Sequence, residues 1–290
     1  MSFYANKTAA ITGAASGIGR ALAVTLAQRG CQVALCDVDA AGLAETAALA
    51  ANTGVKVTQA HVDVANREAV YAWAAQVAAD HGQVHFIFNN AGVALANTIE
   101  GADCADMEWL MGINFWGVVH GTKAFLPHLR KSGAGHVVNV SSIFGLFAVT
   151  GNSAYHSAKF AVRGFSECLH QEMTVSGAPV KVSIVMPGGI KTRIARASRF
   201  RDDLTALLGG TTEVNKGAFE DRFITTAERA AEIILRGVQR GKLRILVGPD
   251  ATLMDKIVRW FPAGYHKLVL MMTRQQMAKN KKAASRAPGG

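Results

Sequence analysis

The sequence predicts a doubly wound α/β fold, in which seven parallel strands form one sheet between two layers of helices. Short apolar segments alternate with segments of helical periodicity from about residue 7 to residue 247. The strand segments are apolar along their length, and strands buried on both faces are typical of a parallel sheet covered by helices. Right-handed crossovers between such strands give a three-layer αβα (Rossmann-type) arrangement.

The expected elements follow one another in a regular order. Strands are expected at residues 8–12, 32–36, 55–62, 84–88, 136–140, 180–186 and 243–247. Helices are expected at residues 20–29, 43–51, 67–81, 106–129 and 227–240, and from residue 154 onward. In this fold, ligands bind at the carboxyl ends of the strands, and each motif described below begins at or just after such an end.

Length and composition favour one domain at residues 1–250 with an extension at 251–290. The chain has 290 residues, half of them hydrophobic, which is enough to bury a large core. Its four cysteines show neither zinc-ligand nor disulfide spacing, and no metal site is expected. We see no signal peptide and no apolar run of the ~18 residues that span a membrane. A reduced, cytoplasmic protein is therefore expected.

The positive charge is concentrated at the C-terminal end. The formal net charge is +10, but residues 251–290 contain eight Lys or Arg and one acid, a net charge of +7. The first 250 residues therefore carry only about +3. Because no nucleic-acid-binding motif accompanies this charge, we expect no nucleic-acid partner.

The loop after the first expected strand is rich in glycine. It contains Gly13, Gly17 and Gly19, with Ser16 and Ile18 between them. Glycines let the backbone turn tightly, and the helix N-terminus that follows attracts anions through its free N–H groups and its dipole. The loop therefore predicts a site for a dinucleotide pyrophosphate, with a purely structural turn as the alternative.

Asp37 follows the second expected strand, eighteen residues after Gly19. An acidic side chain there can accept hydrogen bonds from both hydroxyls of an adenine ribose and would repel a 2′-phosphate. Arg20 is expected to face away from the loop, and Ser16 offers no positive charge. The site is expected to prefer NAD over NADP; a plain turn aspartate is the alternative.

A serine, a tyrosine and a lysine form the candidate catalytic set. Tyr155 and Lys159 are four residues apart on an expected helix and share one face of it. An ammonium group beside a phenol lowers the phenol's pKa, so that it can exchange a proton with an alcohol or carbonyl oxygen. Ser142 would supply the second hydrogen bond to that oxygen. The alternative is an ordinary surface tyrosine and lysine.

Taken together, the motifs resemble those of the short-chain dehydrogenase/reductase family, in its compact single-domain branch, over about residues 7–247. The matching residues are Thr12-Gly13-x-x-x-Gly17-x-Gly19, Asp63, Asn89-Asn90-Ala91-Gly92, Asn114, Ser142, Tyr155-x-x-x-Lys159 and Pro187-Gly188-x-Ile190-x-Thr192. They occur in the family's order and at its spacings.

This resemblance implies a role for each member of a four-residue catalytic set. Tyr155 would be the general acid and base, and Ser142 would position the substrate oxygen. Lys159 would bind the nicotinamide ribose and lower the pKa of Tyr155. Asn114 would hold a water that links Lys159 to solvent; the alternative is a buried asparagine satisfied by backbone groups.

The resemblance also implies the cofactor contacts. Asp63 and Val64 would contact the adenine, Asn90 the ribose on the adenosine side, the Ile190 backbone the nicotinamide carboxamide, and Thr192 a phosphate. The full expected set is Gly13, Ser16, Gly17, Ile18, Gly19, Asp37, Asp63, Val64, Asn90, Ala91, Gly92, Tyr155, Lys159, Pro187, Gly188, Ile190 and Thr192.

The expected reaction is the reversible oxidation of a secondary alcohol to a ketone with NAD, which makes the protein an alcohol dehydrogenase. Apolar residues after Ser142 and in an expected lid at about 193–225 favour a bulky apolar substrate. A basic run in that lid (Lys191, Arg193, Arg196, Arg199 and Arg201) is interpreted as a solvated face. The alternatives are an NADPH-dependent carbonyl reductase and a non-catalytic dinucleotide sensor.

Two features concern partners. The resemblance implies a homodimer or homotetramer that pairs through the helices carrying Asn114 and Tyr155. The extension predicts amphipathic helices at 252–261 and 265–277, followed by a lysine-rich tail. Packing against the same or a neighbouring subunit is the favoured interpretation, and attachment to a membrane surface is the alternative.

Overall fold

The central sheet has the predicted seven parallel strands. The computed structural model describes residues 2–192, 194, 197–220 and 223–284. In sheet order the strands are β11 (Arg244–Val247), β7 (Val180–Pro187), β6 (Gly135–Val140), β4 (Phe86–Asn89), β1 (Thr8–Thr12), β2 (Gln32–Asp37) and β3 (Val57–His61). Strand order reverses beside β1, which lies between β2 and β4, so a crevice opens there at the carboxyl ends of the strands.

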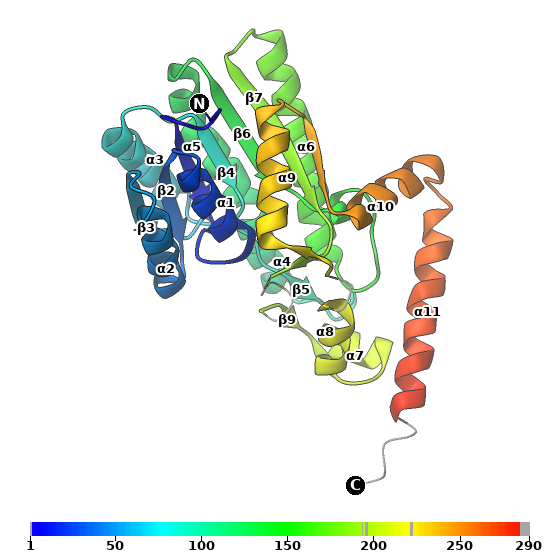
Figure 1. Ribbon diagram of the computed structural model, residues 1–290. Helices are drawn as coiled ribbons and strands as arrows, with labels where there is room; N and C mark the ends of the chain where they lie inside the picture. The colour runs from blue at the N-terminus through cyan, green and yellow to red at the C-terminus, as the bar shows by residue number, and fades with distance from the viewer. Residues whose placement is uncertain (1, 193, 195–196, 221–222, 285–290) are drawn as a thin grey trace.

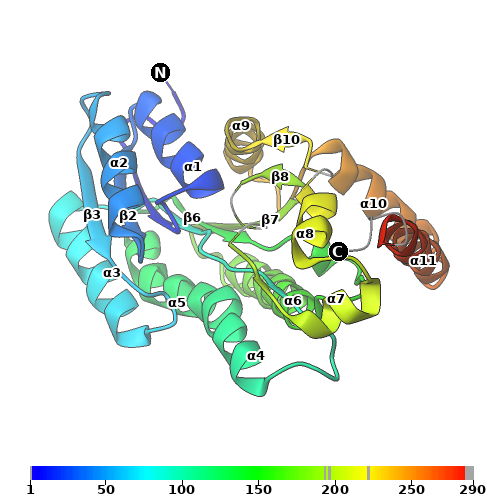
Figure 2. The same cartoon turned by 90° about the horizontal axis from the view of Figure 1, so that it is seen from below.

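Helices cover both faces of the sheet, as predicted (Figures 1 and 2). One layer contains α1 (Gly17–Gln28), α2 (Ala40–Ala51) and α9 (Ala227–Gln239). The other contains α3 (Arg67–His81), α5 (Gly117–Lys131) and α6 (Ser153–Val175). Leu22 and Ile234 are fully buried in the first layer, and Phe125 is fully buried beside Trp73 in the second. Two apolar cores therefore clamp the sheet and fix the strand ends that carry the motifs.

The helix predicted at 106–129 is interrupted. It consists of α4 (Cys104–Met111), a π-helical turn (Gly112–Trp116) and α5. A π turn adds one residue without ending the helix, so apolar periodicity could not reveal it. Such turns are frequent at functional sites, and this one contains Asn114.

Short elements surround the strand ends. Two small parallel pairs join β5 (Leu95–Ala96) to β9 (Arg199–Phe200) and β8 (Ile190–Lys191) to β10 (Thr225–Thr226). A 3-10 turn lies at Ile143–Gly145, and helices α7 (Asp202–Leu208) and α8 (Thr212–Glu220) complete the segment after β9. These elements lie below the sheet in Figure 1. The lid expected at 193–225 includes 193, 195–196 and 221–222, which lie outside the described residues.

The extension forms two helices, α10 (Pro249–Trp260) and α11 (Tyr265–Ala284). Tyr265 and Ile257 pack on Phe147 in a third apolar cluster. Further along α11, the Asn280 amide donates to Leu208 O at 3.1 Å, which ties the helix to α7. In Figure 1, α11 runs along the outside of the molecule toward α7. Within the described residues, no helix is long and apolar enough to cross a membrane.

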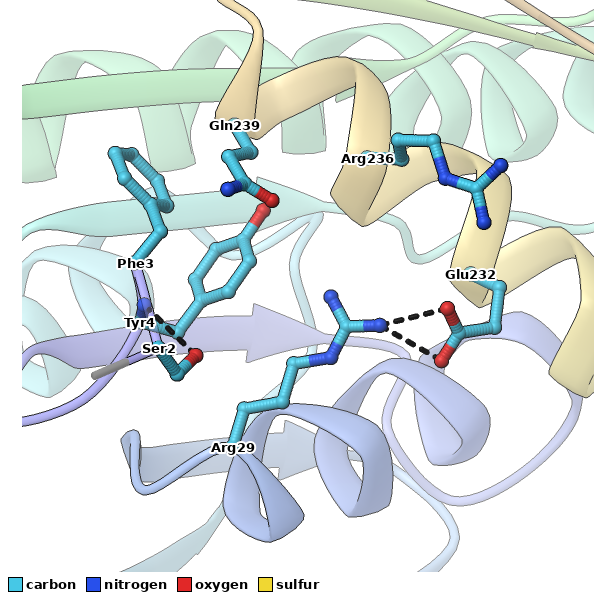
Figure 3. A pocket seen from close by; sticks show the side chains of 7 residues that line it. All are labelled: Ser2, Phe3, Tyr4, Arg29, Glu232, Arg236 and Gln239. Carbon is cyan, nitrogen blue, oxygen red and sulfur yellow. Dashed lines mark hydrogen bonds and ion pairs between the residues drawn. The ribbon is translucent and has the colours of Figure 1, made fainter.

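The N-terminal segment is held at the amino ends of the strands, opposite to the motifs (Figure 3). The Tyr4 hydroxyl donates to Leu235 O at 2.5 Å, and Arg29 contacts both carboxylate oxygens of Glu232 at 2.6 and 2.7 Å. A cavity of about 310 Å³ lies between these groups. Because Tyr4 precedes β1 and Arg29 follows α1, this cavity belongs to the amino ends of the strands, away from the motifs.

Candidate active site

The glycine loop before α1 packs closely against Ala91 and Thr192. Gly13 has φ 66°, and a Cβ atom there would lie 2.7 Å from Ala91 Cα. Gly17 has φ 54°, and a Cβ atom there would lie 3.0 Å from Thr192 Cγ2. Ser16, which precedes the helix, makes no side-chain cap hydrogen bond to the described chain. The first N–H groups of α1 therefore remain available to an anion.

Thr12 and Asn90 hold this loop against the end of β4. Thr12 Oγ1 accepts hydrogen bonds from the N–H groups of Asn90 and Ala91, both at 3.0 Å. The Asn90 amide nitrogen donates to Thr12 O at 3.0 Å and to Gly13 O at 3.1 Å. Both amide protons of Asn90 are therefore used by the loop. Sequence reasoning gave Thr12 no role, although its place before Gly13 was visible.

Asp37 lies beside the glycine loop, as its position after β2 predicts. Its carboxylate accepts hydrogen bonds from Ala15 N at 2.9 Å and from Asp39 N at 3.0 Å. Arg20 turns toward α2, where its guanidinium donates to Ala15 O at 2.6 Å and contacts Glu45 at 2.8 Å. The loop therefore has an acid beside it, and Arg20, which was expected to face away, instead binds the loop at Ala15 O and pairs with Glu45.

Asp63 and Val64 follow β3, at the same edge of the sheet. The Asp63 carboxylate accepts a hydrogen bond from Ala65 N at 2.9 Å, and the Val64 side chain is buried. The Val64 carbonyl lies 3.2 Å from His120 Nδ1 on α5. Asp63 and His120 line an open cavity of about 610 Å³ beside the crevice.

The structure brings Ser142, Tyr155 and Lys159 together at the carboxyl end of β6. Ser142 begins the 3-10 turn, where its hydroxyl accepts a hydrogen bond from Phe144 N at 3.1 Å, and its side chain acts on Tyr155 to lower the pKa of the phenol. Lys159 Nζ lies 5.5 Å from the centre of the Tyr155 ring and donates to Val140 O at 3.1 Å. Helix α6 thus presents both residues to the strand end, as their spacing predicts.

Burial controls the proton affinities of the pair. It raises the pKa of Tyr155 to about 12, against which the hydrogen bond with Ser142 acts to lower it. Burial also lowers the pKa of Lys159 to about 8. We expected the lysine to lower the tyrosine's pKa. The net shift of the Tyr155 pKa is upward instead, because burial removes solvent from the phenol.

Asn114 lies beside the lysine, but its amide is already occupied. Its Oδ1 accepts a hydrogen bond from Val93 N at 2.8 Å, and its Nδ2 donates to Val93 O at 2.9 Å. A Cβ atom on Gly92 would lie 3.3 Å from Asn114 Oδ1 and 3.6 Å from Lys159 Nζ, so these groups meet at one point. The side chain thus has the backbone-satisfied form given above as the alternative, and its relay role stays a prediction.

The loop after β7 faces the glycine loop. Thr192 approaches Gly17, and Ile190 is buried in β8. Gly189 N donates to Asp250 Oδ2 at 2.6 Å, while the buried Asp250 Oδ1 has no partner among the described residues. Asp250 lies at the start of α10, beside Pro187-Gly188. Sequence reasoning missed it, because no motif marks a residue 61 positions further along the chain.

Apolar side chains close the site next to the tyrosine. Phe144 contacts both Tyr155 and Phe147 edge-on, with ring centres 6.2 and 5.5 Å apart. Leu204, from the segment expected to form the lid, is buried against Gly151. The expected basic residues Arg193 and Arg196, and the side chain of Phe219, lie outside the described residues.

Arg199 and Arg201 are held in ion pairs, whereas Lys191 is exposed. Arg199 contacts the buried Asp106 carboxylate at 2.9 Å and stacks 3.6 Å from the Trp109 ring centre. Arg201 binds the other carboxylate oxygen of Asp106. Both side chains are half exposed, as a solvated face predicts, but their charge also fastens β9 to α4.

A doubly wound parallel sheet with a glycine loop at its crevice, and a partly buried tyrosine beside a buried lysine and serine at the neighbouring strand end, defines a dinucleotide-binding oxidoreductase. The family model described as short chain dehydrogenase matches residues 7–203. The chain belongs to the short-chain dehydrogenase/reductase family.

Individual relatives agree with this assignment. An oxidoreductase named SadH from Mycobacterium tuberculosis is 48% identical over 271 residues, which cover 93% of this chain and 96% of that protein. Estradiol 17-beta-dehydrogenase 11 from Macaca fascicularis is 37% identical over 63% of this chain and 61% of its own. The crystal structure of a short chain dehydrogenase/reductase from Burkholderia phymatum in complex with NAD has a TM-score of 0.81. It is 29% identical and covers 90% of this chain and 95% of that chain.

Proposed function

We propose that this protein catalyses the reversible oxidation of secondary alcohols to ketones with NAD, through Tyr155, Ser142 and Lys159. The observation that carries the proposal is their convergence: the Ser142 side chain acts on Tyr155 to lower its pKa, and the Lys159 ammonium lies one helical turn away at the same strand end. A non-catalytic dinucleotide sensor would have no need of this set.

The residues present fit an NAD molecule. Gly13 and Gly17 have positive φ and pack so closely against Ala91 and Thr192 that a side chain at either position would clash, and the first N–H groups of α1 have no side-chain cap. Asp37 lies beside the glycine loop, where we place the adenine ribose, and the charge of Arg20 is paired with Glu45. The NAD complex of the Burkholderia phymatum relative supports the same cofactor, and we therefore propose NAD rather than NADP.

Each side chain has a distinct task in the proposed reaction. When bound, NAD accepts the hydride, and its oxidised ring brings a positive charge to the site. Tyr155 Oη takes the proton of the substrate hydroxyl, for which the phenol must first ionise. The Ser142 hydroxyl oxygen accepts a hydrogen bond from Phe144 N, so the hydroxyl hydrogen can be donated to Tyr155 Oη or to the substrate oxygen. Positive charge beside the phenol lowers its pKa from the value that burial gives it.

Lys159 and Asn114 shape the site around the tyrosine. Lys159 Nζ gives one hydrogen to Val140 O and retains two, which we assign to a nicotinamide ribose hydroxyl and to a water on the way to solvent. Asn114 fixes Val93, and with it the segment that passes beside Gly92 and Lys159. We propose that Asn114 works chiefly by holding this segment, with the water contact as its further role.

The walls of the site favour a bulky apolar alcohol. Phe144 lies edge-on to Tyr155 and packs with Phe147 and Leu146, and Leu204 closes over Gly151. We assign the segment at about 193–225 as a lid on a catalytic domain at 1–250. The four free thiols are consistent with a cytoplasmic enzyme, and pairing of α5 and α6 would give a homodimer or homotetramer.

Activity and cofactor binding test the proposal separately. A screen of secondary alcohols with NAD⁺, read by NADH absorbance, should find turnover, and Tyr155→Phe should lower kcat by at least about a hundredfold. NADH fluorescence on the same variant should show unchanged cofactor binding. If Tyr155→Phe binds NADH and retains turnover close to that of the wild type, the proposal fails.

A further inference from the structure

The outward side of α10 and α11 exposes large apolar side chains. Trp260 is 78% exposed and Phe261 64% exposed at the turn between the two helices. Leu253, which shares a face of α10 with Trp260, is 59% exposed, and Leu270 and Met271 of α11 are each 50% exposed. The inward side of both helices packs on the third apolar cluster or bonds to α7. These outward residues therefore contribute nothing to the core of their own subunit.

Basic side chains share this outward side. Lys256 lies between Leu253 and Trp260 on α10, and Lys267 and Arg274 lie at i, i+3, i+4 and i+7 spacing with Leu270 and Met271 on α11. These three cations are exposed and have no acidic partner within the described residues. By contrast, Arg259 is paired with Asp255 at 2.9 Å. Asp255, the acid of the extension, is thus already paired, and the outward side is apolar and positively charged.

The positive charge and the apolar side chains of this outward side distinguish between the partners that could bind to it. A second copy meeting this side about a two-fold axis would bring like charges together, since the extension carries a net charge of +7. A nucleic acid would leave Leu253, Trp260 and Phe261 in water. A membrane surface with acidic lipids satisfies both features, because tryptophan and phenylalanine enter the boundary between headgroups and acyl chains while lysine and arginine remain among the phosphates.

We propose that α10 and α11 attach the protein peripherally to an acidic lipid bilayer, with Trp260 and Phe261 inserted. Asn280 bonds to Leu208 O and Gly209 O, so the anchoring helix is fastened to α7 in the segment over the site. Attachment therefore places that segment near the lipid surface, from which apolar molecules can reach it. The proposal does not depend on the proposed reaction, because it concerns only binding to lipid.

Vesicle flotation of the full chain tests the proposal. With vesicles of phosphatidylcholine containing about one third phosphatidylglycerol, the protein should float, and with pure phosphatidylcholine it should stay in solution. The charge variant Lys256→Glu/Lys267→Glu/Arg274→Glu should weaken binding on the order of a hundredfold, since each cation contributes roughly a fivefold gain at such a surface. The apolar variant Trp260→Ser/Phe261→Ser should weaken it at least about tenfold.

Matched variants elsewhere show whether position matters. Val175→Ser removes an apolar side chain that is 89% exposed at the end of α6, and Lys131→Glu/Arg240→Glu/Lys242→Glu reverses three exposed charges away from the extension. Both should float almost as the wild type does. Tm and NADH binding of all variants should be unchanged, which excludes misfolding. The proposal is overturned if the wild type stays in solution with acidic vesicles. It is also overturned if the control variants lose binding equally, or if light scattering shows that the apolar variant only dissociates an oligomer.

Discussion

The side chain of Asn114 and the backbone of Val93 are joined by two hydrogen bonds, one in each direction, at 2.8 and 2.9 Å. Asn114 is fully buried in the π turn, so the pair fixes the segment after β4 against the helix that crosses it. The same Asn114 oxygen lies next to Lys159 across Gly92. A buried asparagine can therefore serve catalysis by setting the path of a neighbouring backbone.

Replacing Asn114 by alanine should cost both stability and activity. The N–H and C=O of Val93 would lose their partners, which should lower the free energy of unfolding by about 2–4 kcal/mol. Urea denaturation measures this loss, and kcat should fall with it. Asn114→Asp keeps the acceptor and loses the donor, so its loss should be intermediate. An alanine variant as stable as the wild type would contradict the positioning role.

The Ser142 side chain should set the pH dependence of alcohol oxidation. It lowers the pKa of Tyr155 against the effect of burial, so Ser142→Ala should raise that pKa. Oxidation needs the phenolate, so the rising limb of kcat/KM with pH should move to higher pH in the variant. Ser142→Thr restores the hydroxyl and should restore the limb. If the rise of kcat/KM in Ser142→Ala occurred at the wild-type pH, or at a lower pH, Ser142 would have no part in proton transfer.

Asp37 should determine the choice between NAD and NADP. Asp37→Ala removes the acceptor for the ribose and the charge that repels a 2′-phosphate. The ratio of kcat/KM for NAD⁺ to that for NADP⁺ should therefore fall roughly tenfold to a hundredfold. Asp37→Asn keeps an acceptor for the Ala15 N–H and removes only the charge. This variant therefore distinguishes the hydrogen bond that supports the glycine loop from the repulsion of a 2′-phosphate. An unchanged ratio in both variants would place cofactor choice elsewhere.

Sequence patterns predicted the sheet and its layers because most strands are largely apolar and most motifs follow a strand end. The Tyr155–Lys159 relationship was also visible, since helical spacing alone places both residues on one face. Strand order could not be predicted in this way. It depends on which apolar surfaces meet across the sheet, and β4 joins β1 over more than seventy intervening residues.

Contacts between distant segments were beyond sequence reasoning for the same reason. Asp250 reaches Gly189 only because β11 pairs with β7 and delivers α10 to that loop. The upward shift in the pKa of Tyr155 was missed because spacing shows the neighbouring charge but not the loss of solvent. The ion pairs of Arg199 and Arg201 with Asp106 join residues 93 and 95 positions apart.

The pairing of Asp106 with Arg199 and Arg201 should keep the segment after β9 closed. The two arginines hold the pKa of the Asp106 carboxyl below its usual value. The negative charge of Asp106 is therefore present at neutral pH, and it is lost only in acid, when the pH falls below the usual pKa of an aspartate. Asp106→Asn should speed amide hydrogen exchange at Arg199 and Arg201 and raise the KM for substrate severalfold. The exposed Asp202 provides a control, and Asp202→Asn should change neither quantity. Equal exchange in Asp106→Asn and the wild type would show that the strand pairing suffices.

His136, buried between β4 and β7, should make the fold sensitive to mild acid. Ser183 donates its hydrogen to Lys242 O at 2.7 Å, so its oxygen accepts from His136 Nε2 at 2.8 Å. Burial lowers the pKa of His136 to about 3, whereas the unfolded chain takes up this proton near pH 6.5. Stability should therefore fall as pH decreases from about 6.5 toward 3, by about 1.4 kcal/mol per pH unit for this group. Urea denaturation of His136→Gln, which can still donate to Ser183, should show a smaller loss between neutral pH and about pH 5 than the wild type, by roughly 2 kcal/mol. His266→Gln, which changes an exposed histidine, should retain the wild-type dependence of the free energy of unfolding on pH. If His136→Gln lost stability as steeply as the wild type, another buried group would cause the acid sensitivity.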